Sequence, residues 1–123
     1  MKYFSIYIPD PKTNGFSPPT GSQKEEMDRF VAEALARGEF LGGGGFLSLK
    51  DHGAIVRRSN GESSVVDGPY TESKELIGGF AMLQYDSREA AIDGARRFMD
   101  VAGDGECITY RIVDGPHDPD AQC

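Results

Sequence analysis

Four charged side chains that could do chemistry lie between two apolar stretches in residues 65–80, VVDGPYTESKELIGGF. Asp67 opens an Asp-Gly-Pro turn, and Glu72, Lys74 and Glu75 follow it within a few residues. A carboxylate at the end of a strand can act as a general base or anchor a substrate. We therefore take Asp67 as the candidate catalytic base, and Glu72, Lys74 and Glu75 as candidate substrate-binding or orienting groups.

The same residues have a structural interpretation. Asp before Gly-Pro readily caps a turn through its own backbone, and a second Asp-Gly-Pro occurs at residues 114–116. Glu72 and Glu75 are three residues apart, so they share one side of a short helical turn whose dipole favours acids. The segment is then a solvated turn with a salt bridge or two. In the functional interpretation, Lys74 and one Glu form a buried pair at the dimer seam or the pocket mouth. The sequence leaves the structural and the functional interpretation open.

The other metal-ligating and nucleophilic side chains form no recognisable site. His52 is expected in a loop between strands, and His117 lies near the end of the chain without a second ligand group. Two cysteines without CxxC spacing predict neither a zinc site nor a disulfide framework. Cys107 is expected to be a small core residue and Cys123 a tail thiol. We expect no metal and no cofactor.

Two glycine motifs predict close backbone packing. The run from Gly42 to Gly45 lacks a following GK[ST] and leads into no helix, which argues against a phosphate loop and favours a bent sheet edge. Gly78-Gly79 indicates close backbone approach or a bulge at the start of a central strand.

Charge and hydropathy exclude several partners. The net charge is −7, and the basic pair Arg57-Arg58 is expected to be a solvated strand end, so we expect no nucleic-acid partner. No apolar run approaches the roughly 20 residues that span a bilayer, so we expect no membrane partner. The first residues alternate and stop at Pro9, which is typical of a strand and not of a signal peptide, so the expected location is cytoplasmic.

Hydrophobic periodicity predicts two helices and a series of strands. A capping box at Ser22–Glu25 precedes an apolar stripe that includes Leu35, and Gly38 is the expected end of that helix. Asp86 and Ser87 offer a cap for a second helix with apolar residues between 91 and 102. Asn60-Gly61 predicts a tight hairpin. The expected strands are residues 2–8, a glycine-rich region at 39–49, and 54–58, 63–66, 79–85 and 107–113.

This order of elements predicts an α+β fold. Two β-α-β halves make a ferredoxin-like sandwich, in which both helices cover one face of an antiparallel sheet. Strand 79–85 is apolar on both faces, with Phe80 and Met82 on one and Ala81 and Leu83 on the other. The second face therefore predicts a homodimer, sheet against sheet. We expect one domain over residues 1–113 and a flexible C-terminal tail at 114–123.

Residues 67–80 resemble the signature D-G-P-[FY]-x-E-x-K-E-x-x-G-G-[FY] of the DGPF-domain branch of the YCII-related family. The N-terminal MKY, the glycine-rich region and the hairpin before the motif agree, so the resemblance covers about residues 1–113. It implies a ferredoxin-like sandwich that forms a dimeric α/β barrel. Some relatives are implied to be enzymes with a histidine near the start of the first helix and an aspartate. Residues 17–22 contain no histidine here, and that pair is not carried over.

The leading hypothesis is a small cytoplasmic homodimer that binds a small organic molecule in a cleft near the Asp-Gly-Pro motif. Conversion of that molecule would use Asp67 as the base. The alternative is a non-catalytic dimeric interaction or regulatory module, which needs only the dimer surface. The sequence leaves open whether the protein is an enzyme.

Overall fold

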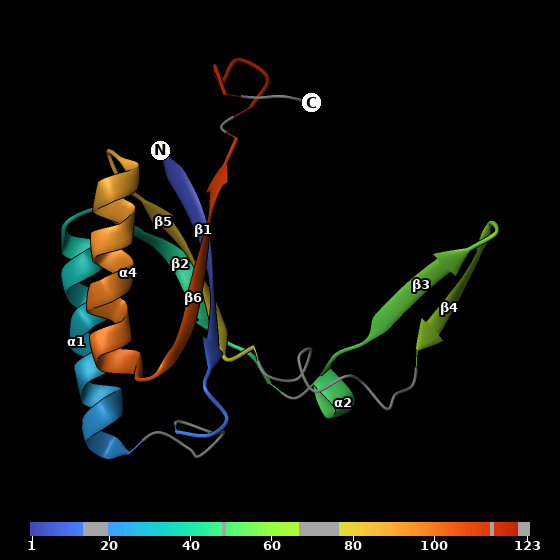
Figure 1. The fold of residues 1–123 in the computed structure, drawn as a ribbon, viewed down its shortest axis with the longest axis horizontal. Helices are drawn as coiled ribbons and strands as arrows, with labels where there is room; N and C mark the ends of the chain where they lie inside the picture. Colours follow the sequence, from blue (N-terminus) through green and yellow to red (C-terminus); the bar gives the residue numbers. More distant parts are fainter. Residues whose placement is uncertain (14–19, 48, 67–76, 114, 121–123) are drawn as a thin grey trace.

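The computed structural model describes residues 1–13, 20–47, 49–66, 77–113 and 115–120 (Figure 1). The described residues supply two helices that face one sheet, a separate hairpin and one short helix. The elements are β1 (Lys2–Pro9), α1 (Gly21–Ala36), β2 (Phe40–Gly45), α2 (Leu49–His52), β3 (Ile55–Ser59), β4 (Glu62–Val66), β5 (Gly79–Gln84), α4 (Arg88–Ala102) and β6 (Gly105–Ile112).

The main sheet has the strand order β2-β5-β1-β6, and every neighbouring pair is antiparallel. Both α1 and α4 lie on the same face of this sheet (Figure 1). This is the order of a ferredoxin-like α+β sandwich, in which each β-α-β half contributes one central and one edge strand. The predicted fold class is confirmed at this level. No helix among the described residues is long and apolar enough to cross a membrane.

The N-cap of helix α1 lies two residues before the predicted one. Thr20, not Ser22, is the N-cap: its side chain accepts a hydrogen bond from the Gln23 amide at 3.2 Å, and the Gln23 side chain accepts one from the Thr20 amide at 2.9 Å. The prediction of Ser22 and Glu25 was wrong because Thr20-x-x-Gln23 satisfies the same pattern two residues earlier. Gly38 follows the helix with φ 72°, which confirms the predicted end.

Helix α4 packs on the sheet through small residues. Ser87 caps it by accepting a hydrogen bond from the Ala90 amide at 3.1 Å, as predicted. Ala91 is buried against Tyr3 and Tyr85, whose rings lie 6.2 Å apart. A Cβ at Gly94 would overlap the Tyr85 hydroxyl and ring. The core on this side is therefore built from tyrosine rings that enter gaps left by small helix residues.

The apolar stripe of α1 is narrower than predicted. Ala34 is buried, and Phe30 reaches the Phe98 ring of α4 with the centroids 6.2 Å apart. Leu35, which was expected in the stripe, is 57% exposed, so this part of the prediction was wrong. Helix α1 packs on α4 and β2 with only part of the face that periodicity marks.

Burial raises the pKa of Tyr85 above its ordinary value of 10.0, and the nearby Glu39 carboxylate raises it further. The unfolded chain then loses this proton at lower pH than the folded chain does. The stability that neutral Tyr85 contributes is therefore present below about pH 10 and lost as pH rises above it. We expect the free energy of unfolding, measured by urea titration, to fall between pH 9 and pH 11.

A Tyr85→Phe variant is the control for this pH effect, because it keeps the buried ring and removes the titrating hydroxyl. Its stability should fall less steeply over the same interval. Equal slopes for wild type and Tyr85→Phe would show that other groups cause the loss.

The predicted hairpin is present but does not join the main sheet. Asn60 and Gly61 both have positive φ, 53° and 81°, as a two-residue type I′ turn requires. Strands β3 and β4 pair only with each other and stand apart from the sandwich (Figure 1). The glycine-rich strand region ends at Gly45, and Leu49–His52 is a helical turn where strand and then loop were expected. That part of the prediction was wrong.

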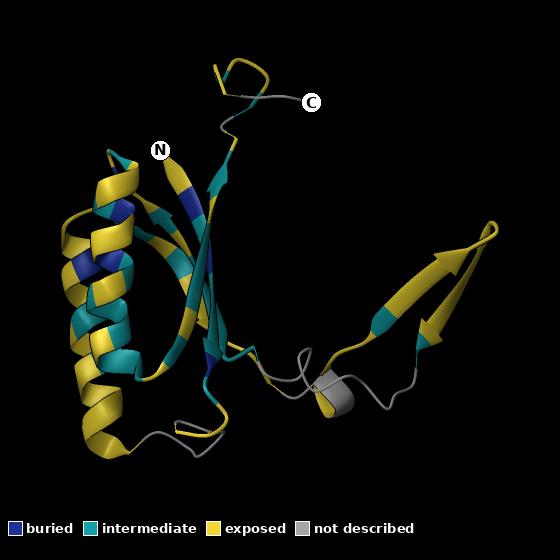
Figure 2. Ribbon diagram, in the orientation of Figure 1, coloured by how far each residue is buried: buried dark blue, intermediate teal, exposed yellow. Residues whose placement is uncertain are grey.

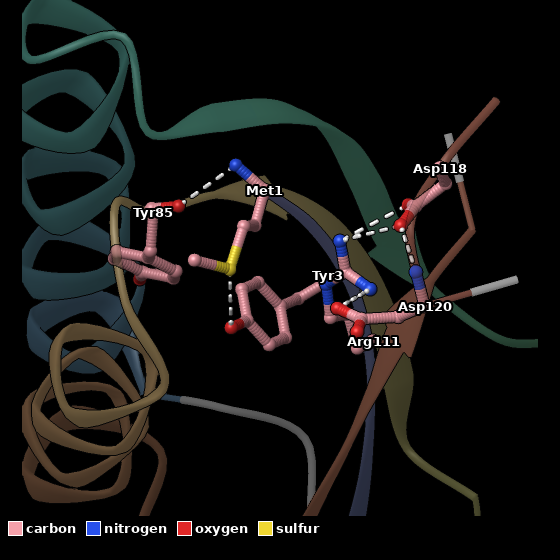
Figure 3. A network of polar contacts seen from close by, with 6 residues as sticks. All are labelled: Met1, Tyr3, Tyr85, Arg111, Asp118 and Asp120. Carbon is pink, nitrogen blue, oxygen red and sulfur yellow. Dashed lines mark hydrogen bonds and ion pairs between the residues drawn. The ribbon is translucent and has the colours of Figure 1, made fainter. Parts of the chain in front are cut away.

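A polar network ties the end of β6 to the residues that follow it (Figure 3). Arg111 donates to both carboxylate oxygens of Asp118, at 3.2 and 3.0 Å, and pairs with Asp120 at 3.0 Å. On the neighbouring strand, the Met1 ammonium donates to the Tyr85 carbonyl at 3.0 Å. Residues 115–120 are thus anchored to β6 by one arginine. Flexibility of the tail stays a prediction.

Candidate functional site

The predicted site residues Asp67, Glu72, Lys74 and Glu75 lie in residues 67–76, outside the part of the chain that the structure describes. Their roles stay predictions. The structure describes both flanks of this segment: Val66 ends β4, and Gly78 leads into β5. The geometry of these flanks and of the surfaces beside them defines the candidate site.

Gly78 fixes the point where the charged segment returns to the sheet. Its amide donates to the Tyr7 carbonyl at 2.8 Å, and its carbonyl accepts from the Phe46 amide at 3.1 Å. A Cβ at Gly78 would lie 3.3 Å from side-chain carbons of Tyr7 and Pro9. At Gly79 a Cβ would lie 2.8 Å from the Gly44 carbonyl oxygen. The predicted close backbone approach is confirmed.

Strand β2 is an edge strand whose glycines leave its neighbour uncovered. Gly42 pairs with Met82 and Gly44 with Phe80, and the register shifts between Phe40 and Gly42. This shift is an irregularity in the pairing just before the glycine run, and the bend expected for that run stays a prediction. Because Gly42 and Gly44 have no side chains, nothing from β2 shields Phe80 and Met82 on that face.

The face of the sheet opposite the helices is apolar and aromatic. The register puts Phe4 between Met82 and Tyr110, and Ile6 between Phe80 and Ile108. No described helix covers this side (Figure 2). Phe46 is 50% exposed and Tyr110 is 56% exposed. We call this surface the open face; its residues are Phe4, Ile6, Phe46, Phe80, Met82, Ile108 and Tyr110.

Three rings form a row on the open face. The Phe80 ring stacks on Phe46 with the centroids 5.2 Å apart and on Phe4 with the centroids 6.0 Å apart, both at an interplanar angle of 29°. The row ends at Phe46, whose amide donates a hydrogen bond to the Gly78 carbonyl. An aromatic surface therefore ends where the charged segment rejoins the sheet. Such a place can hold an apolar body by stacking and a polar group by charge.

The sequence predicted the part of the open face that β1 contributes, but not the part that Phe46 contributes. The alternation of residues 2–8 put Phe4, Ile6 and Ile8 on one face, and that face is the uncovered one, because Tyr3, Ser5 and Tyr7 point toward the helices. Phe46 was missed because it follows β2 and reaches the face only through its contacts with Phe80 and Gly78.

A hollow lies on the helix side of the sheet, between α4 and β6. It has a volume of about 680 Å³ and is open to solvent. Arg88 and Arg96 of α4 stand on one side, and Cys107 and Thr109 of β6 on the other. Cys107 is a free, half-buried thiol on its wall. This hollow and the aromatic row lie on opposite faces of the sheet.

The histidines do not complete a metal site in the described part of the chain. His52 lies in α2 and His117 in the turn after β6, and both are exposed. Among the described residues, no group of three or more His, Cys, Asp or Glu side chains is arranged to hold a metal ion.

The topology defines a class of small α+β proteins with a ferredoxin-like sheet. Within it, the family model of the YCII-related domain matches residues 1–114, and the chain belongs to the YCII-related family. The predicted resemblance is confirmed.

Two similar proteins extend the comparison. An uncharacterized protein of Rhizobium meliloti (strain 1021) is 44% identical over 43 residues, which is 35% of this chain and 35% of that protein. The match thus spans about a third of the length of that relative. The solved structure of 5-chloro-2-hydroxyhydroquinone dehydrochlorinase from Burkholderia phenoliruptrix AC1100, in complex with 2,5-dihydroxybenzoquinone, is similar at 18% identity. Its TM-score is 0.44, covering 96% of this chain and 99% of that one.

Proposed function

We propose that this protein is a homodimer, packed sheet against sheet as a dimeric α/β barrel, that binds a small organic molecule in a cleft near the Asp-Gly-Pro motif, at the Phe46 end of the open face. The observation that carries this proposal is the aromatic row Phe4-Phe80-Phe46. The row ends where the Phe46 amide donates a hydrogen bond to the Gly78 carbonyl. The aromatic row can stack on the body of a ligand, and the charged side chains of the segment that follows Val66 can bind its polar groups. A cytoplasmic location is part of the same proposal.

The open face supports the dimer because exposing so much apolar surface to water is energetically unfavourable. Monomeric proteins rarely expose a contiguous apolar patch of more than a few hundred Å². Here the patch crosses the whole sheet, from β2 to β6, and no described element of the chain covers it. A second copy buries an identical patch, as two-fold symmetry requires.

Conversion of the ligand is the catalytic part of the proposal. Asp67 is the general base in this proposal, because a carboxylate at the end of a strand can take a proton from a bound substrate. Lys74 stabilises the negative charge that forms on the substrate, and Glu72 and Glu75 orient the groups. Asp67→Asn keeps the size of the side chain and removes its basicity, so it separates binding and turnover from turn formation.

A thermal-shift screen tests the site. We expect an aromatic carboxylate or phenol from a panel of salicylate, phenylacetate, catechol and succinate to raise the melting temperature of wild type. At ten times its dissociation constant, the shift should be roughly 5 °C, from about 1.4 kcal/mol of added stability. A well-folded Asp67→Asn should lose most of this shift.

The opposite pattern supports the interaction module instead. Asp67→Asn would then lower the melting temperature by several degrees without any ligand, and no compound would stabilise wild type. Asp67 would be a structural turn residue, and the open face a surface for protein contacts alone.

A further inference from the structure

The hairpin formed by β3 and β4, residues 55–66, is an arm that stands apart from the main sheet (Figure 1). Val56 and Val65 are opposed across the two strands, yet they are 68% and 61% exposed. An isolated two-stranded hairpin is marginally stable in water, and three strands or a packed face are needed for more. An exposed apolar pair of this kind indicates that the arm packs on another surface when the protein is assembled.

The position of the arm indicates what packs on its exposed valines. In Figure 1 the arm stands on the side of the sheet away from α1 and α4, which is the side of the open face. Five-residue strands give it a reach of roughly 15 Å. A second copy seated on the open face therefore occupies the space that lies between the sheet and the arm.

The charge of the arm is opposite to that of the body. The arm carries Arg57, Arg58 and Glu62, which leaves 11 basic and 19 acidic residues for the rest of the chain. Neither arginine is in an ion pair with a residue of the described part of the chain. Because side chains alternate along a strand, Arg58 shares the face of Val56 and Val65, whereas Arg57 is on the other face.

We propose that, in the homodimer, the arm of each copy clasps the other copy through Val56 and Val65, with Arg58 paired to carboxylates of the partner. This inference rests on the proposed dimer. It also gives the dimer a role at the site, since Val66 ends the arm and is bonded directly to Asp67. Docking of the arm fixes the place where the charged segment begins.

Photo-crosslinking of the full-length protein tests the clasp. The residue p-benzoylphenylalanine replaces Val56 in one variant and Ser64, on the opposite face of the arm, in another. Sedimentation first gives the mass of each variant in solution. We expect a dimer mass for both, and a covalent dimer on irradiation from position 56 at several times the yield from position 64.

Two results would overturn the clasp in different ways. A dimer mass with no covalent dimer from position 56, or with equal yields from 56 and 64, would refute the arm contact and leave the proposed dimer intact. A monomer mass for wild type at high concentration would refute the dimer and the clasp together.

Charge reversal gives an independent measurement on the same arm. Arg58→Glu should weaken dimerisation by about 10-fold at low salt, with a smaller effect at high salt, because rim charges between partners are screened. Arg57→Glu is the matched control and should leave the dissociation constant within about 2-fold. Equal effects of the two substitutions would contradict the assignment of the docking face.

Discussion

Replacing Tyr110 by aspartate is expected to turn the dimer into a monomer at micromolar concentration. Tyr110 lies on the open face beside Phe4 and is 56% exposed, so a monomer tolerates a charge at this position. In a two-fold dimer, however, the substitution places two carboxylates against an apolar surface, where each must be desolvated without a partner. We expect at least a 100-fold increase in the dissociation constant, equivalent to about 2.7 kcal/mol, in a sedimentation dilution series.

Leu35→Asp is the matched control for this experiment. Leu35 is equally exposed, at 57%, but it lies on α1, on the helix side of the sheet. Its replacement should leave the dimer intact. If Leu35→Asp dissociated the dimer and Tyr110→Asp did not, the copies would meet through the helices, and the open face would not be the interface.

Gly94→Ala should cause a large loss of stability from a single methyl group. Helix α4 lies so close to Tyr85 that a Cβ at Gly94 would overlap the Tyr85 hydroxyl, with the next ring carbon at 2.6 Å. Either the helix must move away or the ring must leave its buried position, where it is 8% exposed. Overpacking of this kind costs about 3 kcal/mol, well above the gain of about 1 kcal/mol from better helix propensity. Urea unfolding measures the difference.

Two variants separate this clash from a general effect of alanine. Gly21, the first residue of α1, has nothing within 4 Å of its Cβ position, so Gly21→Ala should leave stability unchanged or slightly higher. Adding Tyr85→Phe to Gly94→Ala removes the nearest atom and should restore part of the loss. If Gly94→Ala were as stable as wild type, the close packing of α4 on Tyr85 would be contradicted.

Local signals in the sequence were enough to predict the elements of the sandwich and the separate hairpin. Asn60-Gly61 marks the hairpin because only residues tolerant of positive φ fit a type I′ turn. Gly38 marks the end of α1 for the same reason. The alternation in residues 2–8 sorted side chains correctly onto the two faces of β1. These signals work because each depends on the residue itself and its immediate neighbours.

The features that were missed depend on contacts between distant residues. Leu35 fits the apolar stripe of α1, but it is 57% exposed, because α1 packs through Phe30 and Ala34 instead. No pattern in residues 54–66 says whether the hairpin joins the main sheet, because that depends on the path of the chain on either side. The place of Phe46 in the aromatic row likewise depends on Phe80 and Gly78.

The candidate site could be predicted only as a segment. The motif from Asp67 to Phe80 named the charged groups, and the described flanks show where the segment meets the sheet. The open face comes from β1, β5 and β6 together with Phe46, and no contiguous motif contains all of these residues.

Amide chemical-shift mapping tests the central claim most directly. The compound of the screening panel that gives the largest thermal shift is titrated into the ¹⁵N-labelled protein, and the shifted amides are assigned. We predict the largest changes at Phe46, Gly78 and Phe80, the end of the aromatic row beside the charged segment. Changes confined to Arg96, Cys107 and Thr109 would place the ligand in the hollow between α4 and β6, and would contradict a site on the open face.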